Sequence, residues 1–253
     1  MLGLFGKSRF LEPEIEDWVL EAWAWLMVRL GGMERLGLTP LVLANRDSFP
    51  LTETEGEARG AYLFERVKAL MGLEAWPCDL EAVERPRVGQ VAQFTIIEPS
   101  RAANGTFVRT AQGARIRYAA ELVAQPRILI PTLAHELAHY RLSAIPDGRP
   151  GGEALEELLT ELTVAFRGFG VFAANAAFEF GQHGDAFSQG WRSSRNGYLS
   201  ERTWAFVLAL FCALKDIDVP SDQLKPSVAD LTRKATHYLK RNAGLLEPLR
   251  HIP

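Results

Sequence analysis

One stretch constrains this chain more than any other: Thr132-Leu-Ala-His135-Glu136-Leu-Ala-His139-Tyr140. Two histidines four positions apart project from one face of an α-helix and can bind a single metal ion through their imidazole nitrogens. Glu136 lies one step around the helix, close enough to take a proton from a water at that metal. The pattern therefore predicts a helix with one face devoted to chemistry.

The residues around the motif support a helix that is covered on both sides. An apolar stripe faces the core and consists of Ile130, Leu133, Leu137 and Tyr140. The residues that flank the histidines are small or apolar: Pro131, Ala134, Ala138 and Leu142. A solvated face would carry lysine and glutamate there, so we expect the histidines to lie beneath another element. Prolines suit early helix turns, so the helix is expected to start between Pro126 and Pro131 and to end near Ser143.

Composition sets the class of protein. The 253 residues are 47% hydrophobic and 23% charged, enough to build a substantial core. We expect a single domain over residues 1–253, with an N-terminal α/β lobe at 1–125 and a helical lobe at 126–253 that carries the metal site. A net charge of -3, with scattered lysine and arginine, predicts no nucleic-acid partner. The oligomeric state has no signature in the sequence.

The N-terminus and the cysteines bear on location. The first residues lack the long apolar run of a signal peptide, and no later segment has the length and apolarity of a transmembrane helix. Cys78 and Cys212 are isolated among apolar residues, so we expect reduced thiols rather than a disulfide or metal ligands. These features favour a cytoplasmic protein without a membrane span.

The N-terminal half is expected to hold a small sheet with helices. Apolar periodicity and terminal glycines predict helices at residues 14–30 and 58–71. Predicted strands cover residues 39–43, 78–83, 91–97, 105–110 and 114–123. Trp18, Trp23 and Trp25 widen the apolar surface of the first helix, and core packing is expected for them in preference to a cofactor box.

The C-terminal half is expected to be mainly helical. The loop at residues 145–152, rich in proline and glycine, is either a lid near the site or a plain connector. Helices are predicted at residues 153–177, 200–215 and 225–241. The first of these carries an acidic stripe that consists of Glu153, Glu157 and Glu161. That stripe continues into apolar residues that need cover, so its acids need a partner, and a metal site is one.

On these residues the chain resembles the gluzincins, the thermolysin-like superfamily of zinc peptidases. Those enzymes pair an H-E-x-x-H helix with a second helix that carries an E-x-x-x-D motif, and Glu157-Leu-Leu-Thr-Glu161 matches it with Glu in place of Asp. The resemblance covers roughly residues 135–161 and the preceding order of strands. It implies an α+β, zincin-like fold and one Zn²⁺ per chain, held by the ligands His135, His139 and Glu157. Glu161 would bond a ligating histidine, while Glu153 remains the rival third ligand, with Glu157 then in the supporting role.

The resemblance implies a zinc-dependent hydrolase, foremost a peptidase acting on a peptide or protein substrate, with Glu136 as general base for a metal-activated water. Tyr198 and His183, in a polar segment with Arg192 and Arg195, are candidate substrate or oxyanion contacts. The strand at Ile116–Val123 is expected to be an edge that pairs with the substrate backbone.

Two other functions remain open. One is a catalytically silent zincin-fold protein that keeps zinc and serves as a binding or regulatory module. The other is a helical structural protein with an accidental motif. Glu136 favours the enzyme over the silent protein, because a site kept only to hold zinc needs no general base.

Overall fold

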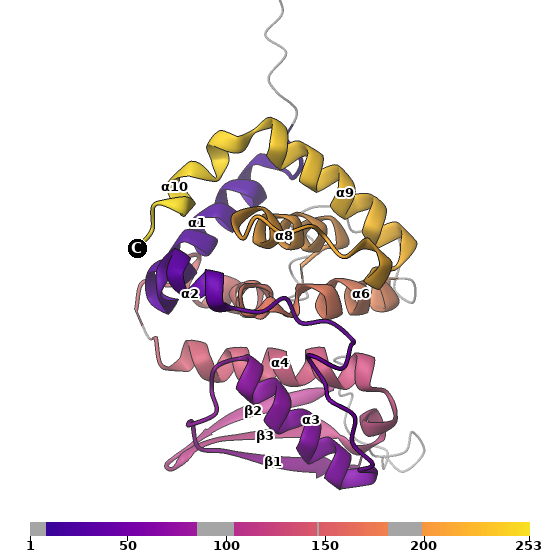
Figure 1. Cartoon of the computed structure of the whole chain (residues 1–253). Coiled ribbons are helices and arrows are strands. Elements are labelled where there is room, and N and C mark those ends of the chain that lie inside the picture. The colour runs from indigo at the N-terminus through magenta and orange to yellow at the C-terminus, as the bar shows by residue number, and fades with distance from the viewer. Residues whose placement is uncertain (1–8, 85–103, 146, 182–198) are drawn as a thin grey trace, which may run out of the picture. The chain divides into compact units, whose positions relative to one another are not determined.

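The computed structural model describes residues 9–84, 104–145, 147–181 and 199–253 (Figure 1). Within them the protein is α+β, with many helices and a three-stranded mixed sheet. Contacts divide the chain into two compact units. The sheet unit comprises Ala44–Ala144, and the helical unit comprises Met1–Leu43 with Ile145–Pro253. These bounds differ from the expected lobes, because the motif helix groups with the sheet and the N-terminal helices group with the C-terminal ones.

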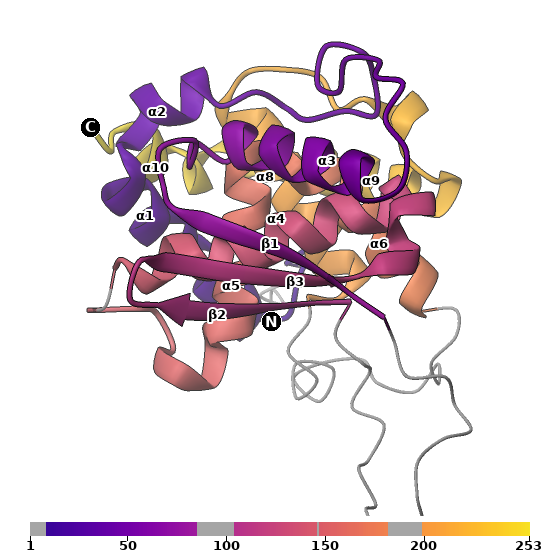
Figure 2. The same ribbon diagram turned by 90° about the horizontal axis from the view of Figure 1, so that it is seen from below.

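The sheet of the sheet unit consists of β1 (Cys78–Val83), β2 (Gly105–Thr110) and β3 (Gly113–Ala119). Figure 2 shows β3 between the other two strands. β1 pairs with β3 in parallel, whereas β2 is antiparallel to it. Two helices, α3 (Gly56–Leu70) and α4 (Pro126–Ser143), pack against the sheet and against each other. A 3-10 helix, Ala120–Ala124, leads from β3 into α4.

The pleat of β3 separates a core face from a polar face. Ala114, Ile116 and Tyr118 are buried, as expected for alternate residues that face the packed helices. On the other face the guanidinium of Arg117 donates to Glu81 of β1 over 2.9 Å. This alternation fixes the register, since a slip by one residue would bury the charged side chains.

The helical unit contains α1 (Pro13–Leu30), α2 (Gly32–Leu38), α5 (Glu156–Val164), α6 (Gly170–Gly181), α8 (Glu201–Leu214), α9 (Pro226–Arg241) and α10 (Glu247–Arg250). Short 3-10 helices cover Gly152–Leu155, Ser221–Gln223 and Ala243–Leu245. α8 lies between α9 and α6 (Figure 1). Trp23 of α1 is fully buried and meets Phe166 edge to face, with 5.5 Å between ring centroids, which confirms its predicted place in the core.

Most predicted elements are confirmed. The helices at 14–30, 58–71, 200–215 and 225–241 and the strands at 78–83 and 105–110 match observed elements closely. The motif helix begins at Pro126, within the predicted interval, and ends at Ser143. Its expected core stripe and the flanking residues Pro131, Ala134, Ala138 and Leu142 are all buried. The predicted strand at 91–97 lies outside the described residues.

The prediction of a strand at 39–43 was wrong, and α2 was not predicted. The segment pairs with none of the described strands. Its backbone bonds elsewhere: the amide of Val42 donates to the carbonyl of Gly168 over 2.9 Å. Sequence periodicity cannot distinguish this single long-range bond from a strand ladder.

The prediction of one helix over 153–177 was also wrong. The segment begins with a 3-10 turn, continues as α5, passes through a π-helical turn at Ala165–Phe169 and resumes as α6. Gly168 breaks it with φ 88°. A Cβ there would lie 1.9 Å from the carbonyl oxygen of Pro40, so glycine lets residues 40–42 dock against the break. Residues 158–174 are buried without exception, which confirms the expected cover over the acidic helix.

The predicted strand at 114–123 ends at Ala119 and gives way to the 3-10 helix. Its expected role as an edge is wrong, since β3 is paired on both sides, with β1 and with β2. β3 has no free edge to offer a substrate.

The loop at residues 145–152 is tied to α1. The indole of Trp18 donates to the carbonyl of Pro150 over 3.4 Å. Arg149 donates to the carbonyl of Ile145 and forms a 2.7 Å ion pair with Glu156. Of the two interpretations, these contacts favour a plain connector.

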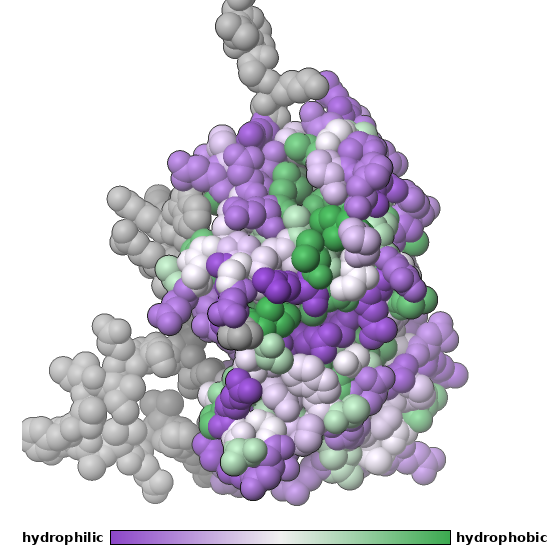
Figure 3. All heavy atoms as spheres, turned by 90° about the vertical axis from the view of Figure 1, so that its left-hand side faces the viewer, coloured by the Kyte–Doolittle hydropathy of each residue, from purple (hydrophilic) through white to green (hydrophobic). Residues whose placement is uncertain are grey.

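Surface and cysteines agree with the composition. Hydrophilic residues predominate on the face shown in Figure 3, with hydrophobic ones in smaller areas among them. In the described part of the chain, no helix combines the length and apolarity needed to cross a membrane.

Both cysteines are free thiols. Cys212 is buried and Cys78 partly so, and burial raises the pKa of Cys212 to about 12.

Candidate metal centre

The motif lies in the middle of α4, where the helix is well supported. Pro126 occupies the first turn, where its missing N–H has no helical partner to lose. Pro131 falls farther inside the helix, and the next residue reinforces that turn, since the hydroxyl of Thr132 donates to the carbonyl of Ile128 over 2.9 Å. His135 and His139 then emerge one above the other from a rigid backbone.

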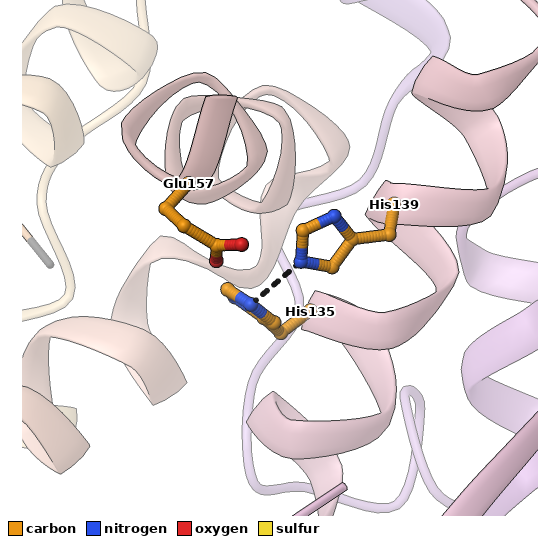
Figure 4. A group of neighbouring side chains, drawn as sticks. All are labelled: His135, His139 and Glu157. Atoms are coloured by element: carbon orange, nitrogen blue, oxygen red, sulfur yellow. Dashed lines mark hydrogen bonds between the residues drawn. The ribbon is translucent and has the colours of Figure 1, made fainter. Parts of the chain in front are cut away.

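The two histidines converge on one point. Their Nε2 atoms are 3.1 Å apart, and their rings meet edge to face with 4.8 Å between centroids. In this geometry one ring nitrogen donates a hydrogen bond and the other accepts it (Figure 4). Both side chains are partly exposed, so the pair remains accessible.

Glu136 is 7% exposed, an unusual setting for a carboxylate. Its side chain lies against the start of β2. A Cβ built on Gly105 would come within 3.0 Å of Glu136 Cγ and 3.1 Å of its Oε1, and within 2.9 Å of Thr132 Cγ2. The strand therefore approaches the motif more closely than any side chain there would permit.

The rest of β2 continues along α4. The ring of Phe107 lies nearly parallel to that of His139, at 8° with 6.2 Å between centroids. One helical turn after His139, the carbonyl of Ser143 accepts a hydrogen bond from the guanidinium of Arg109 over 3.1 Å. The hydroxyl of Tyr140 donates to the carbonyl of Pro77. Burial raises the pKa of Tyr140, so this hydroxyl stays neutral and keeps the proton that it donates. The strand thus lines the motif helix from Glu136 to its C-terminus.

The acids expected from the second helix belong to the helical unit. Glu157 is exposed in the first turn of α5, whereas Glu161, one turn later, is 8% exposed. Glu153 precedes α5 and lies in the 3-10 turn, where it is exposed. Glu156 is engaged with Arg149.

Of the three expected ligands, the structure brings His135 and His139 together on α4 (Figure 4). Glu157 comes from the helical unit and the histidines from the sheet unit, so its part in the site is a proposal.

Several expected contacts fall outside this picture. Tyr198, His183, Arg192 and Arg195 lie outside the described residues. Sequence reasoning did not identify Gly105 and Phe107 as neighbours of the motif. The available signal was weak, since Gly105 followed Asn104 as a turn pair and Phe107 occupied an inward position of a short predicted strand.

The chain matches no protein-family model, no curated protein and no solved structure. The resemblance to gluzincins therefore rests on the motif residues of the two helices.

Proposed function

We propose that this protein is a zinc-dependent hydrolase, foremost a peptidase, with a zincin-like site. The observation that carries the proposal is the convergence of His135 and His139, whose Nε2 atoms are 3.1 Å apart, with the buried carboxylate of Glu136 between them on the helix. A solvated helix has no reason to gather these three groups.

The donor set fits zinc. Zn–N bonds of about 2.0–2.1 Å at a tetrahedral angle put two ligating nitrogens about 3.3 Å apart. The observed 3.1 Å needs little adjustment. Two imidazoles and one carboxylate, here His135, His139 and Glu157, form a set typical of catalytic zinc, which leaves a coordination position for water or substrate.

Glu161 supports the proposed ligand set. It lies one helical turn beyond Glu157 and is nearly buried, where a carboxylate requires a hydrogen-bonding partner. A ligating histidine has a second ring nitrogen that seeks such an acceptor. We assign Glu161 this role because Glu157 and Glu161 lie one turn apart on α5, whereas Glu153 lies outside that helix.

When bound, zinc lowers the pKa of its water toward neutrality and polarises the substrate carbonyl. Glu136 would accept a proton from the attacking water as the water oxygen bonds to the carbonyl carbon. It would then give the proton to the amine nitrogen as the C–N bond breaks, so the base returns to its starting state. The near burial of Glu136 strengthens its electrostatic action on the reacting groups.

β2 is the strand suited to hold an extended substrate. It is an edge of the described sheet, and it runs along the motif helix, past Glu136 and His139. An added peptide strand would gain main-chain hydrogen bonds there while its scissile bond lay beside the motif.

Zinc stoichiometry and peptide cleavage test the proposal together. Wild type reconstituted with zinc should hold one ion per chain and cleave members of a peptide library, read by mass spectrometry. Glu136→Gln should keep the ion and lose on the order of a hundredfold or more in turnover. Glu57→Gln, an exposed acid of α3 in the same unit, is the matched control and should leave both unchanged.

Each part of the proposal can fail separately. Less than about a tenth of an equivalent of tightly bound metal would overturn the site, because intact three-ligand sites fill. Full zinc occupancy without any cleavage would support the silent binding or regulatory protein. Unchanged turnover in Glu136→Gln would refute the assigned base.

A further inference from the structure

We infer that Gly105 is a positioning residue for Glu136: the absence of a side chain at the first residue of β2 determines where the general base lies. The kinetic consequence rests on the proposed function. The contact itself lies within the sheet unit and can be tested without any metal.

The spacing leaves no room for a methyl group. A Cβ on Gly105 would meet Thr132 Cγ2 at 2.9 Å, Glu136 Cγ at 3.0 Å and Glu136 Oε1 at 3.1 Å. Carbon atoms pack best at about 3.5–4.0 Å, so the contacts with Thr132 Cγ2 and Glu136 Cγ are repulsive. The contact with Glu136 Oε1 is also shorter than ordinary van der Waals contact. Two of the three involve Glu136.

Backbone conformation does not explain this glycine. Gly105 is absent from the residues with positive φ, and it pairs with Tyr118 as an ordinary member of β2. Alanine can therefore adopt the backbone conformation of Gly105 without strain. What the position requires is close approach of the strand to α4, one of the established uses of glycine in a strand.

Glu136 is the neighbour that would yield to a methyl group. Thr132 is β-branched, and its hydroxyl is bonded to Ile128 within the helix, so its rotamer is restricted. The strand is held along α4 by the Phe107–His139 and Arg109–Ser143 contacts. The longer Glu136 side chain has more rotatable bonds and moves at the lowest energy.

Displacement of Glu136 would leave the histidines in place. We therefore expect Gly105→Ala to bind zinc as wild type does, to keep KM within about threefold and to lose roughly ten- to a hundredfold in kcat, as misplaced catalytic groups do. Reduced zinc stoichiometry, or a loss confined to KM, would overturn the inference.

A thermal-unfolding cycle on metal-free protein tests the contact independently of activity. Gly105→Ala should lower the midpoint by about 3 °C or more in the wild-type background. In a Glu136→Ala background, which removes two of the three close contacts, the same change should lower it by less than half as much. Gly37→Ala is the control, because nothing lies within 4 Å of its Cβ position, and it should lower the midpoint in neither background.

Equal losses in the two backgrounds would show that Gly105 does not act through Glu136 and would overturn the inference. Should Glu136→Ala fail to fold, Glu136→Ser keeps a polar group while removing Oε1 and serves in its place. Wild type without hydrolytic activity would remove the proposed function, while the unfolding cycle would still decide whether the contact exists.

Discussion

Gly168→Ala is expected to destabilise the helical unit strongly. Gly168 adopts φ 88° at the break between α5 and α6, a conformation that L residues with a Cβ rarely adopt. The added Cβ would lie 1.9 Å from the carbonyl oxygen of Pro40, which belongs to the backbone and cannot rotate aside. The hydrogen bond from the Val42 amide to the Gly168 carbonyl would weaken as the two segments separate.

The expected loss follows from three contributions. The left-handed backbone costs alanine about 1–2 kcal/mol. Forcing apart two packed segments costs about 1–3 kcal/mol, and weakening one buried hydrogen bond costs about 1 kcal/mol. The lower conformational entropy of unfolded alanine returns less than about 1 kcal/mol. We therefore expect the free energy of unfolding to fall by on the order of 4 kcal/mol.

Urea unfolding of the metal-free protein, followed by tryptophan fluorescence, measures this loss, since Trp23 packs against Phe166 near the break. Gly170→Ala is the matched control two residues away. Gly170 has helical φ and ψ, and its Cβ would meet the flexible end of Leu208 at 3.2 Å, so its change should stay within about 1 kcal/mol. A loss below about 1 kcal/mol at Gly168, or equal losses at both glycines, would refute the reasoning.

Two further predictions concern the metal ligands and the dependence of stability on acid pH. Glu157→Ala should abolish tight zinc binding and Glu161→Ala should weaken it by roughly ten- to a hundredfold in competition with a chromophoric chelator; if Glu153→Ala strips the metal while Glu157→Ala only weakens it, the assigned register is wrong by one turn. The hydrogen bond from Arg250 holds the pKa of Asp216 below its ordinary value of 3.8, so the charged pair stabilises the fold above that pH and is lost as Asp216 is protonated below it. The gap in urea midpoint between wild type and Asp216→Asn should thus be present at pH 6 and close in more acidic buffer, whereas a gap independent of pH would contradict it.

The motif helix could be predicted almost completely from the sequence. Helical geometry alone places His135 and His139 on one face, whatever surrounds them. Glycines that follow apolar stripes marked helix ends correctly, as at Gly31 and Gly72, which both adopt positive φ. These features depend on neighbours within one or two turns, so the local sequence contains the whole cause.

The choice between Glu153 and Glu157 as third ligand depends on where the second helix begins. The sequence predicted that boundary less accurately than it predicted the motif helix. Periodicity predicted a helix from residue 153, which would put Glu153, Glu157 and Glu161 on one continuous stripe. In the structure the 3-10 turn at Gly152–Leu155 removes Glu153 from that stripe and α5 begins at Glu156. Helix starts are set by caps and by packing of the preceding loop, here by Trp18 on Pro150 and Arg149 on Glu156, which no local pattern specifies.

Only the tertiary structure decided three further features. Residues 39–43 have a strand-like composition, yet the amide of Val42 bonds to Gly168, far away in the chain. In the described sheet the order of strands makes β2 an edge and β3 the centre, although both have similar sequence patterns. Gly105 resembled a turn glycine, while its place is set by Thr132 and Glu136. In each case the partner is distant in sequence, and the free energy that selects it arises from packing across elements rather than from any local preference.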